Sequence, residues 1–316
     1  MTDPTGRAPI ADCDTLEILE ALERKLLWLS SWTIHHANHV RPKDDDLKVG
    51  GHQASSASLA TIMTALYFRL LRPQDRVAVK PHASPVFHAI QYLLGRQTRT
   101  NLENFRGLGG AQSYPSRTKD SDDVDFSTGS VGLGVAMTAF ASLVQDYIRD
   151  KGWRGRDDRS EGRMIALVGD AELDEGNVFE ALLEGYKHDL RNCWWIIDYN
   201  RQSLDGVIHE GLKARFEEVF RAMGWDIVTL KYGRKLEAAF AEPGGEALRR
   251  WIDDCPNALF STLAYRGGDA WRRHLLDDLG DDARFRALIE HHDDRSLAAL
   301  MTNLAGHDME SILETF

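Results

Sequence analysis

Two apolar runs of this chain each end in residues whose side chains carry oxygen. Arg163–Val168 is followed by Gly169–Glu172, which contains Asp170, and Cys193–Asp198 is followed by Asn200–Gln202. Read as two strands joined by a helix, they form a β-α-β unit, and open parallel sheets bind ligands at the carboxyl ends of their strands. A carboxylate and an amide oxygen at one edge suit Mg²⁺, which takes few protein oxygens and completes its octahedron with phosphate and water. The spacing therefore predicts a magnesium–diphosphate site.

The wider string around these residues resembles the thiamin diphosphate signature, in which Gly-Asp is followed one helix later by Asn. With the extension Leu204–Gly206, the chain is similar to the homodimeric type of pyruvate dehydrogenase, the decarboxylating first component of the 2-oxo acid dehydrogenase complexes and a relative of transketolase. This resemblance implies that Asp170 and Asn200 bind Mg²⁺ through their side chains and Gln202 through its main-chain carbonyl. The simpler alternative, that Asp170 and Asn200 only cap loops, is disfavoured by the two strand contexts and the extension.

The resemblance also implies that Gly169, Ala171 and Glu172 belong to the cofactor-binding turn. Ala171 stands where the family usually has the third glycine of Gly-Asp-Gly. Its methyl group would crowd the diphosphate if the local backbone needs a positive φ.

Two histidine motifs support the same interpretation. Gly50–Ser55 reads Gly-Gly-His-Gln-Ala-Ser, and its small residues precede a predicted helix whose N-terminus favours an anion. It resembles a family motif that implies a place at the cofactor and substrate channel for His52 and Ser55. His82, in His-Ala-Ser-Pro, resembles a family histidine near the diphosphate. Two neighbours depart from the family pattern: Lys80 stands for glutamine and Pro81 for glycine.

A third motif, Ser127–Gly134, is rich in glycine. Its G-x-x-G-x-G order and the lack of a preceding strand exclude a dinucleotide-binding fingerprint, and no phosphate-binding P-loop motif is present. The segment resembles the family element that cradles the two rings of thiamin. By that match the Gly129 carbonyl faces the 4′-amino group, Val131 supports the bent cofactor, and Ser130 and Gly132 complete the binding set. The plain alternative is a glycine-rich turn before a helix.

Two further residues bear on the reaction. Asn104–Arg106 and Ser113–Pro115 resemble the pyruvate dehydrogenase pattern, and transketolases typically carry a histidine where this chain has Tyr114. Tyr114 therefore favours 2-oxo acid decarboxylation over ketose transfer. Glu175 resembles a family acid near the mouth of the active site, although an exposed surface position is an equal alternative.

The glutamate that activates thiamin diphosphate in this family comes from a second, pyrimidine-binding domain, and the resemblance covers only the first domain. We therefore expect the α subunit of a split enzyme that uses a 2-oxo acid, with a β subunit completing an α2β2 heterotetramer and a lipoyl acyltransferase as a candidate acceptor. One alternative is a subunit of a split transketolase-like ketol transferase. The other is a non-catalytic scaffold or regulatory subunit.

Composition limits the other classes. The chain has 316 residues, is 43% hydrophobic, and carries a net charge of −11 without a basic stripe, which argues against binding to nucleic acid. Cys13, Cys193 and Cys255 are too widely spaced for a zinc site. No signal peptide or membrane-spanning run is found, and the cytoplasm is the expected compartment.

Strands that alternate with helices predict an α/β fold, with a parallel sheet covered by helices on both faces. An N-terminal arm and helix (1–45), a cofactor-binding α/β domain (46–265) and a helical C-terminal extension (266–316) are expected. The pattern predicts helices over Thr15–His39, Ser55–Leu71, Pro85–Leu94, Ser130–Asp150, Asn177–His188 and Phe216–Met223, a helical turn at Leu102–Phe105, and short helices over Ala270–Phe316. Besides the two strands of the β-α-β unit described first, it predicts strands over Arg76–Lys80, Asp226–Leu230 and Leu259–Leu263.

Overall fold

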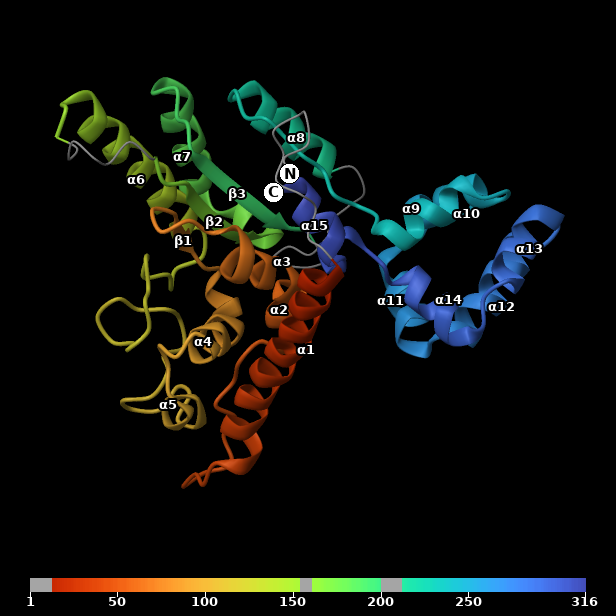
Figure 1. The fold of residues 1–316 in the computed structure, drawn as a ribbon, viewed down its shortest axis with the longest axis horizontal. Coiled ribbons are helices and arrows are strands. Elements are labelled where there is room, and N and C mark those ends of the chain that lie inside the picture. Colours follow the sequence, from red (N-terminus) through yellow and green to blue (C-terminus); the bar gives the residue numbers. More distant parts are fainter. Residues whose placement is uncertain (1–12, 154–160, 200–211) are drawn as a thin grey trace. The chain divides into compact units, whose positions relative to one another are not determined.

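The computed structural model describes residues 13–153, 161–199 and 212–316 of the chain (Figure 1). The chain divides into two compact units. One is Glu17–Val228, and the other combines Met1–Leu16 with Thr229–Phe316, of which residues 1–12 lie outside the described part. The first unit is mixed α/β and the described part of the second is helical, which confirms the predicted fold class.

Among the described residues of the first unit, three strands form a parallel sheet. Its order is β1 (Arg76–Ala78), β2 (Met164–Gly169) and β3 (Cys193–Asp198). The central strand β2 is buried along its whole length, as expected for a parallel strand covered on both faces, whereas β3 is half-buried throughout. Gly169 lies directly opposite Asp198, so the ends of β2 and β3 are aligned at the same edge.

Helices α6 (Leu133–Asp150), α7 (Gly176–Lys187) and α8 (Leu212–Ala222) cover one face of this sheet. Every second residue of the strands packs against them, because side chains alternate between the faces of a strand. In Figure 1, α2 to α4 lie on the side of the sheet opposite to α6 and α7. The buried core under α6 to α8 consists of Ala78, Val135, Ala166, Val168, Leu173, Val178, Leu182 and Phe220.

Helices α1 to α5, which precede the β2-α7-β3 unit, follow the helical periodicity seen in the sequence. The helix predicted over Ser55–Leu71 is present but is interrupted at Leu59, where φ is −100° and ψ is 0°. The elements are α1 (Cys13–His35) with a π-helical turn at His36–Val40, α2 (Gln53–Ser58), α3 (Ala60–Ala65) with a π-helical turn at Leu66–Leu70, α4 (Ser84–Leu93) and α5 (Arg99–Glu103).

The described part of the second unit is formed by short helices around the buried side chain of Trp271. This confirms the short helices predicted for the last part of the chain. The elements are α9 (Arg234–Ala241), α10 (Gly245–Asp254), α11 (Asn257–Arg266), α12 (Gly268–Leu279), α13 (Ala283–Glu290), α14 (Asp294–Met301) and α15 (Met309–Thr315).

Two predicted strands are wrong. Leu259–Leu263 lies inside α11, where Leu259 and Phe260 pack one turn away from Leu263 on the same core, a helical spacing that the short apolar run concealed. Asp226–Leu230 has no regular secondary structure: Ile227 packs on the core under α8, but no described strand pairs with the segment, and Val228 is 72% exposed.

No helix in the described ranges combines the length and the apolar character that a membrane span requires.

Candidate functional site

The carboxyl ends of the three strands meet in a buried polar network. Lys80, two residues after β1, donates through Nζ to Oδ2 of Asp198 at the end of β3, at 2.7 Å. The hydroxyl of Ser58, on α2, donates to the same oxygen at 2.6 Å. The side chains of Lys80 and Asp198 are only 7% and 14% exposed, so a buried ion pair that includes an ammonium group lies at the edge where a phosphate is expected.

Asp170 begins the tight turn that follows β2. The turn is a 3-10 helix over Asp170–Asp174, and Asp170 itself is 2% exposed. One carboxylate oxygen of Asp170 accepts a hydrogen bond from the Ala171 amide at 3.0 Å. A carboxylate held at a strand end is the oxygen ligand that the magnesium hypothesis requires.

Glu172 connects this turn to the glycine-rich motif. Its Oε1 accepts from the Gly169 amide at 2.9 Å, and its Oε2 accepts from the Gly132 amide at 2.8 Å. Burial raises the pKa of Glu172, while these two amides and the charge of Lys80 act in the opposite direction. Glu172 is thus a bridge between two predicted cofactor segments.

The backbone and the neighbours of Gly132 leave no room for a side chain. It adopts a left-handed φ of 76°, and a Cβ at this position would lie 2.9 Å from the Cβ of Glu175. Glu175 is half-buried and lies against the glycine motif.

The remainder of the glycine motif approaches the tyrosine loop. Thr128 donates to the carbonyl of Val79 at 2.7 Å, and a Cβ on Gly129 would lie 3.7 Å from the ring of Tyr114. Gly129 and Ser130 are exposed and Val131 is half-buried, so this stretch can be reached by a ligand.

The two motif histidines lie together. The rings of His52 and His82 stack with centroids 4.1 Å apart, and the His82 ring is 6.3 Å from that of Tyr114. Partial burial, then Arg106 and Lys80, lower the pKa of His52. Burial, then His52, Lys80 and Arg106, lower the pKa of His82, so the neutral form of both rings is favoured at neutral pH and each can donate one hydrogen bond and accept another.

The structure therefore brings most of the expected residues into two linked groups. One group joins the glycine motif to the Asp170 turn through Glu172, and the other contains His52, His82 and Tyr114. Ser55 is half-buried on α2, where its carbonyl accepts from the hydroxyl of Ser58 at 3.2 Å. The expected metal ligands Asn200 and Gln202 lie outside the described residues.

Three residues that position this site were not singled out as site residues in the sequence. Ser58 lies one helical turn after Ser55 and therefore shares its face, and Asp198 is the last residue of β3. Arg106 belongs to a motif noted above, but its proximity to the histidines could not be read from that motif.

A magnesium diphosphate fits the groups present. A buried carboxylate at a strand end, a lysine ammonium at the same edge and small residues in the facing turn provide ligands for both the cation and the anion.

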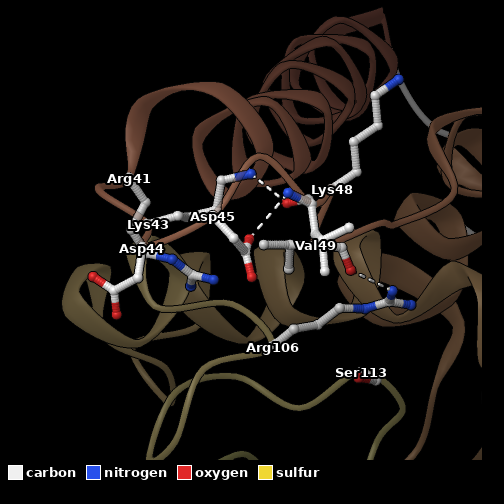
Figure 2. Close-up of a pocket in the computed structure, with 9 residues that line it drawn as sticks. Arg41, Lys43, Asp44, Asp45, Lys48, Val49, Arg106 and Ser113 are labelled. Atoms are coloured by element: carbon white, nitrogen blue, oxygen red, sulfur yellow. Dashed lines mark hydrogen bonds between the residues drawn. The ribbon is translucent and has the colours of Figure 1, made fainter.

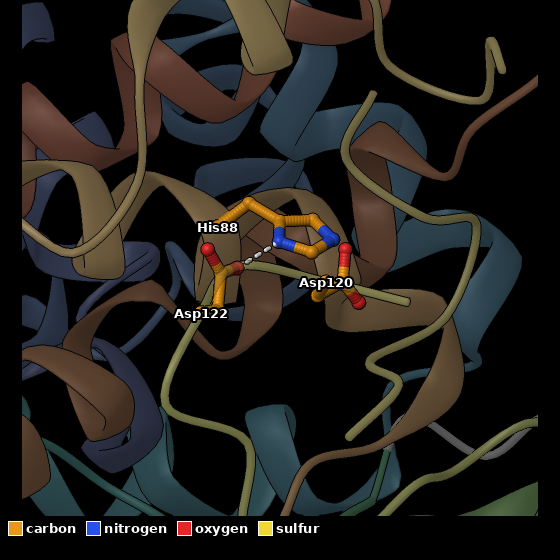
Figure 3. A group of neighbouring side chains, drawn as sticks. All are labelled: His88, Asp120 and Asp122. Atoms are coloured by element: carbon orange, nitrogen blue, oxygen red, sulfur yellow. Dashed lines mark hydrogen bonds and ion pairs between the residues drawn. The ribbon is translucent and has the colours of Figure 1, made fainter. Parts of the chain in front are cut away.

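A second cluster contains His88, Asp120 and Asp122, whose possible ligand atoms lie within 4.8 Å of one another (Figure 3). These atoms already have partners in the protein: His88 pairs with Asp122 through Nδ1 and lies 3.0 Å from the carbonyl of Gln112 through Nε2. Asp120 accepts from the amides of Gln112 and Ser116, at 2.9 and 2.8 Å. The cluster anchors the loop that carries Tyr114 onto α4.

Comparisons with known proteins agree with this geometry. The family model described as "Transketolase, thiamine diphosphate binding domain" matches residues 46–242. The pyruvate dehydrogenase E1 component of Mycobacterium tuberculosis is 28% identical over 314 residues, covering 94% of this chain and 32% of that protein. The corresponding component of Escherichia coli is 27% identical over 312 residues, covering 95% of this chain and 34% of the relative.

Solved structures show the same fold. A transketolase from Leishmania mexicana superposes with a TM-score of 0.57 at 19% identity, covering 66% of this chain and 31% of the other. The chain spans about a third of the length of the curated relatives it matches.

Proposed function

Because the chain belongs to the family of transketolase thiamin diphosphate-binding domains, we propose that it is the α subunit of a thiamin diphosphate-dependent 2-oxo acid dehydrogenase or decarboxylase. The observation that carries this proposal is the bridge made by Glu172. It holds the Gly132 turn against the strand end that presents Asp170, as a site for the two parts of one cofactor requires.

The binding roles follow from the placement of each group. Asp170, with Asn200 and Gln202, would hold Mg²⁺, and Lys80 would offset part of the diphosphate charge. Gly129 to Gly132 would line the ring-binding segment. When bound, the cofactor supplies a nucleophilic carbon and an electron sink for decarboxylation.

The residues of the second group act on the substrate side. The lowered pKa values of His52 and His82 favour the neutral form near pH 7, so each ring can accept a proton from a hydroxyl group and can donate a hydrogen bond to a developing alkoxide. Tyr114 lies beside His82 and presents a phenol where a ketol transferase would typically present an imidazole. This difference supports a 2-oxo acid as the substrate.

A partner subunit is supported by an exposed apolar face on α6 and α7. Such contiguous faces mark protein–protein contacts, and here they would receive the β subunit that supplies the pyrimidine-binding domain in an α2β2 assembly. The face is formed by Phe140, Val144 and Tyr147 of α6, which are 49–56% exposed, and by Phe179, Leu183 and Tyr186 of α7, which are 41–60% exposed.

The odd number and wide spacing of the cysteines favour the cytoplasm as the compartment.

Calorimetry of thiamin diphosphate with Mg²⁺, on the chain together with its co-purified partner, tests the proposal. Asp170→Ala should weaken binding by about 100-fold, because a directly ligating carboxylate is lost. The matched control is Asp174→Ala, which removes an exposed carboxylate from the same turn and should leave the affinity unchanged.

If the wild-type pair does not bind the cofactor, or if Asp170→Ala binds it as well as wild type, the chain is a scaffold and the proposal is wrong. If the cofactor binds and its affinity depends on Asp170, the products formed from a panel of 2-oxo acids and ketose phosphates separate decarboxylation from ketol transfer.

A further inference from the structure

A pocket of about 490 Å³ has Arg106 in its lining (Figure 2). Its walls come from the segment that follows α1 and from the loop that follows α5. The volume falls within the range of small-molecule sites. Six of the lining residues are charged: Arg41, Lys43, Lys48 and Arg106 are positive, and Asp44 and Asp45 are negative.

The two carboxylates leave an excess of positive charge at the pocket, because four lining side chains are cationic and two are anionic. Asp45 accepts from the Leu47 amide at 3.0 Å, and Lys43 donates to the Leu47 carbonyl at 2.5 Å, so this pair shapes the turn itself. In Figure 2 the carboxylate of Asp44 points away from Arg106. Arg41 and Arg106 thus provide guanidinium groups that no pocket carboxylate pairs with among the described contacts.

Arg106 is held in place by several specific features. Its backbone has a φ of 60°, a left-handed conformation that costs a non-glycine residue free energy and is concentrated at functional sites. Its Nη1 donates to the carbonyl of Val49 at 3.0 Å, and a Cβ on Gly50 would come within 2.5 Å of that atom. Its Nε is buried and has no hydrogen-bond partner within the described part of the chain.

The pocket adjoins the predicted reaction channel. Val49 and Ser113 line it, and they precede His52 and Tyr114 closely in the chain. The charge of Arg106 acts on both stacked rings, since after burial it contributes to the lowered pKa of His52 and of His82. An occupant of the pocket would therefore reach toward the imidazole pair.

We propose that this pocket binds a second anionic group of the substrate, a carboxylate or phosphate distant from the reacting carbonyl. Arg106 binds that group through its guanidinium, the planar donor best matched to carboxylate and phosphate oxygens, and Lys48 adds positive charge at the rim. This inference rests on the proposed function and narrows its substrate class. It selects a 2-oxo acid that carries a second, distant carboxylate or phosphate over a short monocarboxylic 2-oxo acid.

Inorganic phosphate is the probe, titrated into the chain with its partner after saturation with thiamin diphosphate and Mg²⁺, so that the diphosphate site is filled. Arg106→Gln should weaken phosphate binding by about tenfold, the loss expected for a charge-assisted hydrogen bond. Lys48→Gln, at an exposed position that should not affect folding, should weaken it by about two- to threefold. The control, Arg215→Gln, removes the same charge from an exposed ion pair on α8 and should change nothing.

Competition then identifies the source of the anion. A 2-oxo dicarboxylate and a ketose phosphate are each tested for displacement of the bound phosphate, with a monocarboxylic 2-oxo acid as the reference. Displacement by either doubly functional compound, but not by the reference, supports the inference. Phosphate binding that is insensitive to both Arg106→Gln and Lys48→Gln, or displacement by neither compound, overturns it.

The same samples distinguish the two proposals. If thiamin diphosphate binds normally while phosphate binding ignores Arg106 and Lys48, the pocket inference fails and the proposed function stands. If thiamin diphosphate does not bind at all but phosphate binding still depends on Arg106, the proposed function fails and only an anion site remains.

Discussion

The two ends of the same sheet each carry a buried ion pair, and the two pairs differ in how fully they are satisfied. At the amino end, Asp75 and Arg163 directly precede β1 and β2. At the carboxyl end, Lys80 and Asp198 follow β1 and end β3. The two pairs use the same chemistry on strands of the same sheet.

The pair at the amino end is closed. Asp75 accepts from the Arg163 guanidinium through Nε at 3.0 Å and Nη2 at 2.5 Å, and also from the amides of Arg163 and Arg72. The guanidinium further donates to the carbonyl of Leu70 at 2.7 Å and lies over the ring of Trp194. Because the carboxylate accepts four hydrogen bonds and the guanidinium donates to both a carboxylate and a carbonyl of the fold, this end stabilises the sheet.

The pair at the carboxyl end is open by comparison. Lys80 makes a single hydrogen bond among the described contacts, to Asp198, although an ammonium carries three donors. Its side chain also lies along Gly169, where a Cβ would be 3.2 Å from the Lys80 Cδ. The buried ion pair at the amino end of the strands thus stabilises the fold, whereas the pair at the carboxyl end leaves hydrogen-bond donors of Lys80 that a ligand can use.

The largest expected effect tests the closed end. Asp75→Ala leaves the Arg163 guanidinium buried without its carboxylate and should lower the free energy of unfolding by about 3–5 kcal/mol, measured by denaturant titration. The control, Asp123→Ala, breaks an exposed pair with Arg96 and should cost at most about 1 kcal/mol. If both variants lose the same free energy of unfolding, the buried pair of Asp75 and Arg163 stabilises the protein no more than an exposed ion pair does.

The pair of Asp75 and Arg163 also predicts that the free energy of unfolding decreases at acid pH. Burial alone would raise the pKa of Asp75, but hydrogen bonds from Arg163 and from backbone amides outweigh it and hold the pKa below its ordinary value. The stabilisation is therefore present above the unfolded pKa of about 4 and is lost as the pH falls through the folded value.

The next effect tests the open end. Lys80→Met should lower the unfolding free energy by about 2 kcal/mol, less than Asp75→Ala, because Asp198 keeps the hydroxyl of Ser58 and some contact with water. Calorimetry should show thiamin diphosphate affinity falling by about tenfold in this variant and not in folded Asp75→Ala. Lys187→Met, in an exposed pair on α7, is the control. A Lys80→Met chain that binds the cofactor normally would make both ends structural.

A smaller effect concerns the backbone beside the pocket. Gly50→Ala places a Cβ at a φ of 88° and against the Arg106 guanidinium, so it should cost about 1–3 kcal/mol of stability and also weaken phosphate binding. Gly306→Ala is the control, since a Cβ there meets nothing within 4 Å. If Gly50→Ala loses stability but binds phosphate with unchanged affinity, the backbone conformation at Gly50 does not contribute to the anion site.

The smallest effect is electrostatic. Since Lys80 helps to lower the pKa of His52 and His82, Lys80→Met should raise both values toward the ordinary one, as measured by NMR of the ring protons, and Asp75→Ala should not. Because their folded pKa is depressed, these histidines disfavour the folded state as the pH falls below the unfolded value of about 6.5. The stability that these histidines remove at acid pH should therefore be smaller in Lys80→Met. If the two variants give identical ring titrations, the charge of Lys80 does not affect the pKa values of the histidines.

The outcome for each segment reflects the range of the interactions involved. Cys193–Asp198 has the same bounds in the sequence prediction and in the structure, because a continuous apolar run between polar residues is a local signal. The five residues Leu259–Leu263 were misassigned because so short an apolar run fits a strand as well as a buried helix face.

Contacts between distant segments could not be obtained in this way. Ser58 and Asp198 are 140 residues apart and meet only because α2 lies at the strand ends. The bridge from Glu172 to Gly132 spans 40 residues and was likewise not predicted, although both residues had been assigned to cofactor motifs. Sequence patterns located the motifs, and the fold determined which of them touch.

The His88 cluster has a consequence for the dynamics of the loop it anchors. Asp120 fixes the amides of Gln112 and Ser116, which flank Tyr114, and His88 holds the Gln112 carbonyl. Breaking this one buried cluster would free all of these backbone groups together. The loop should therefore exchange its amide hydrogens as a single cooperative unit, and Tyr114 would leave the histidines only when that whole unit opens.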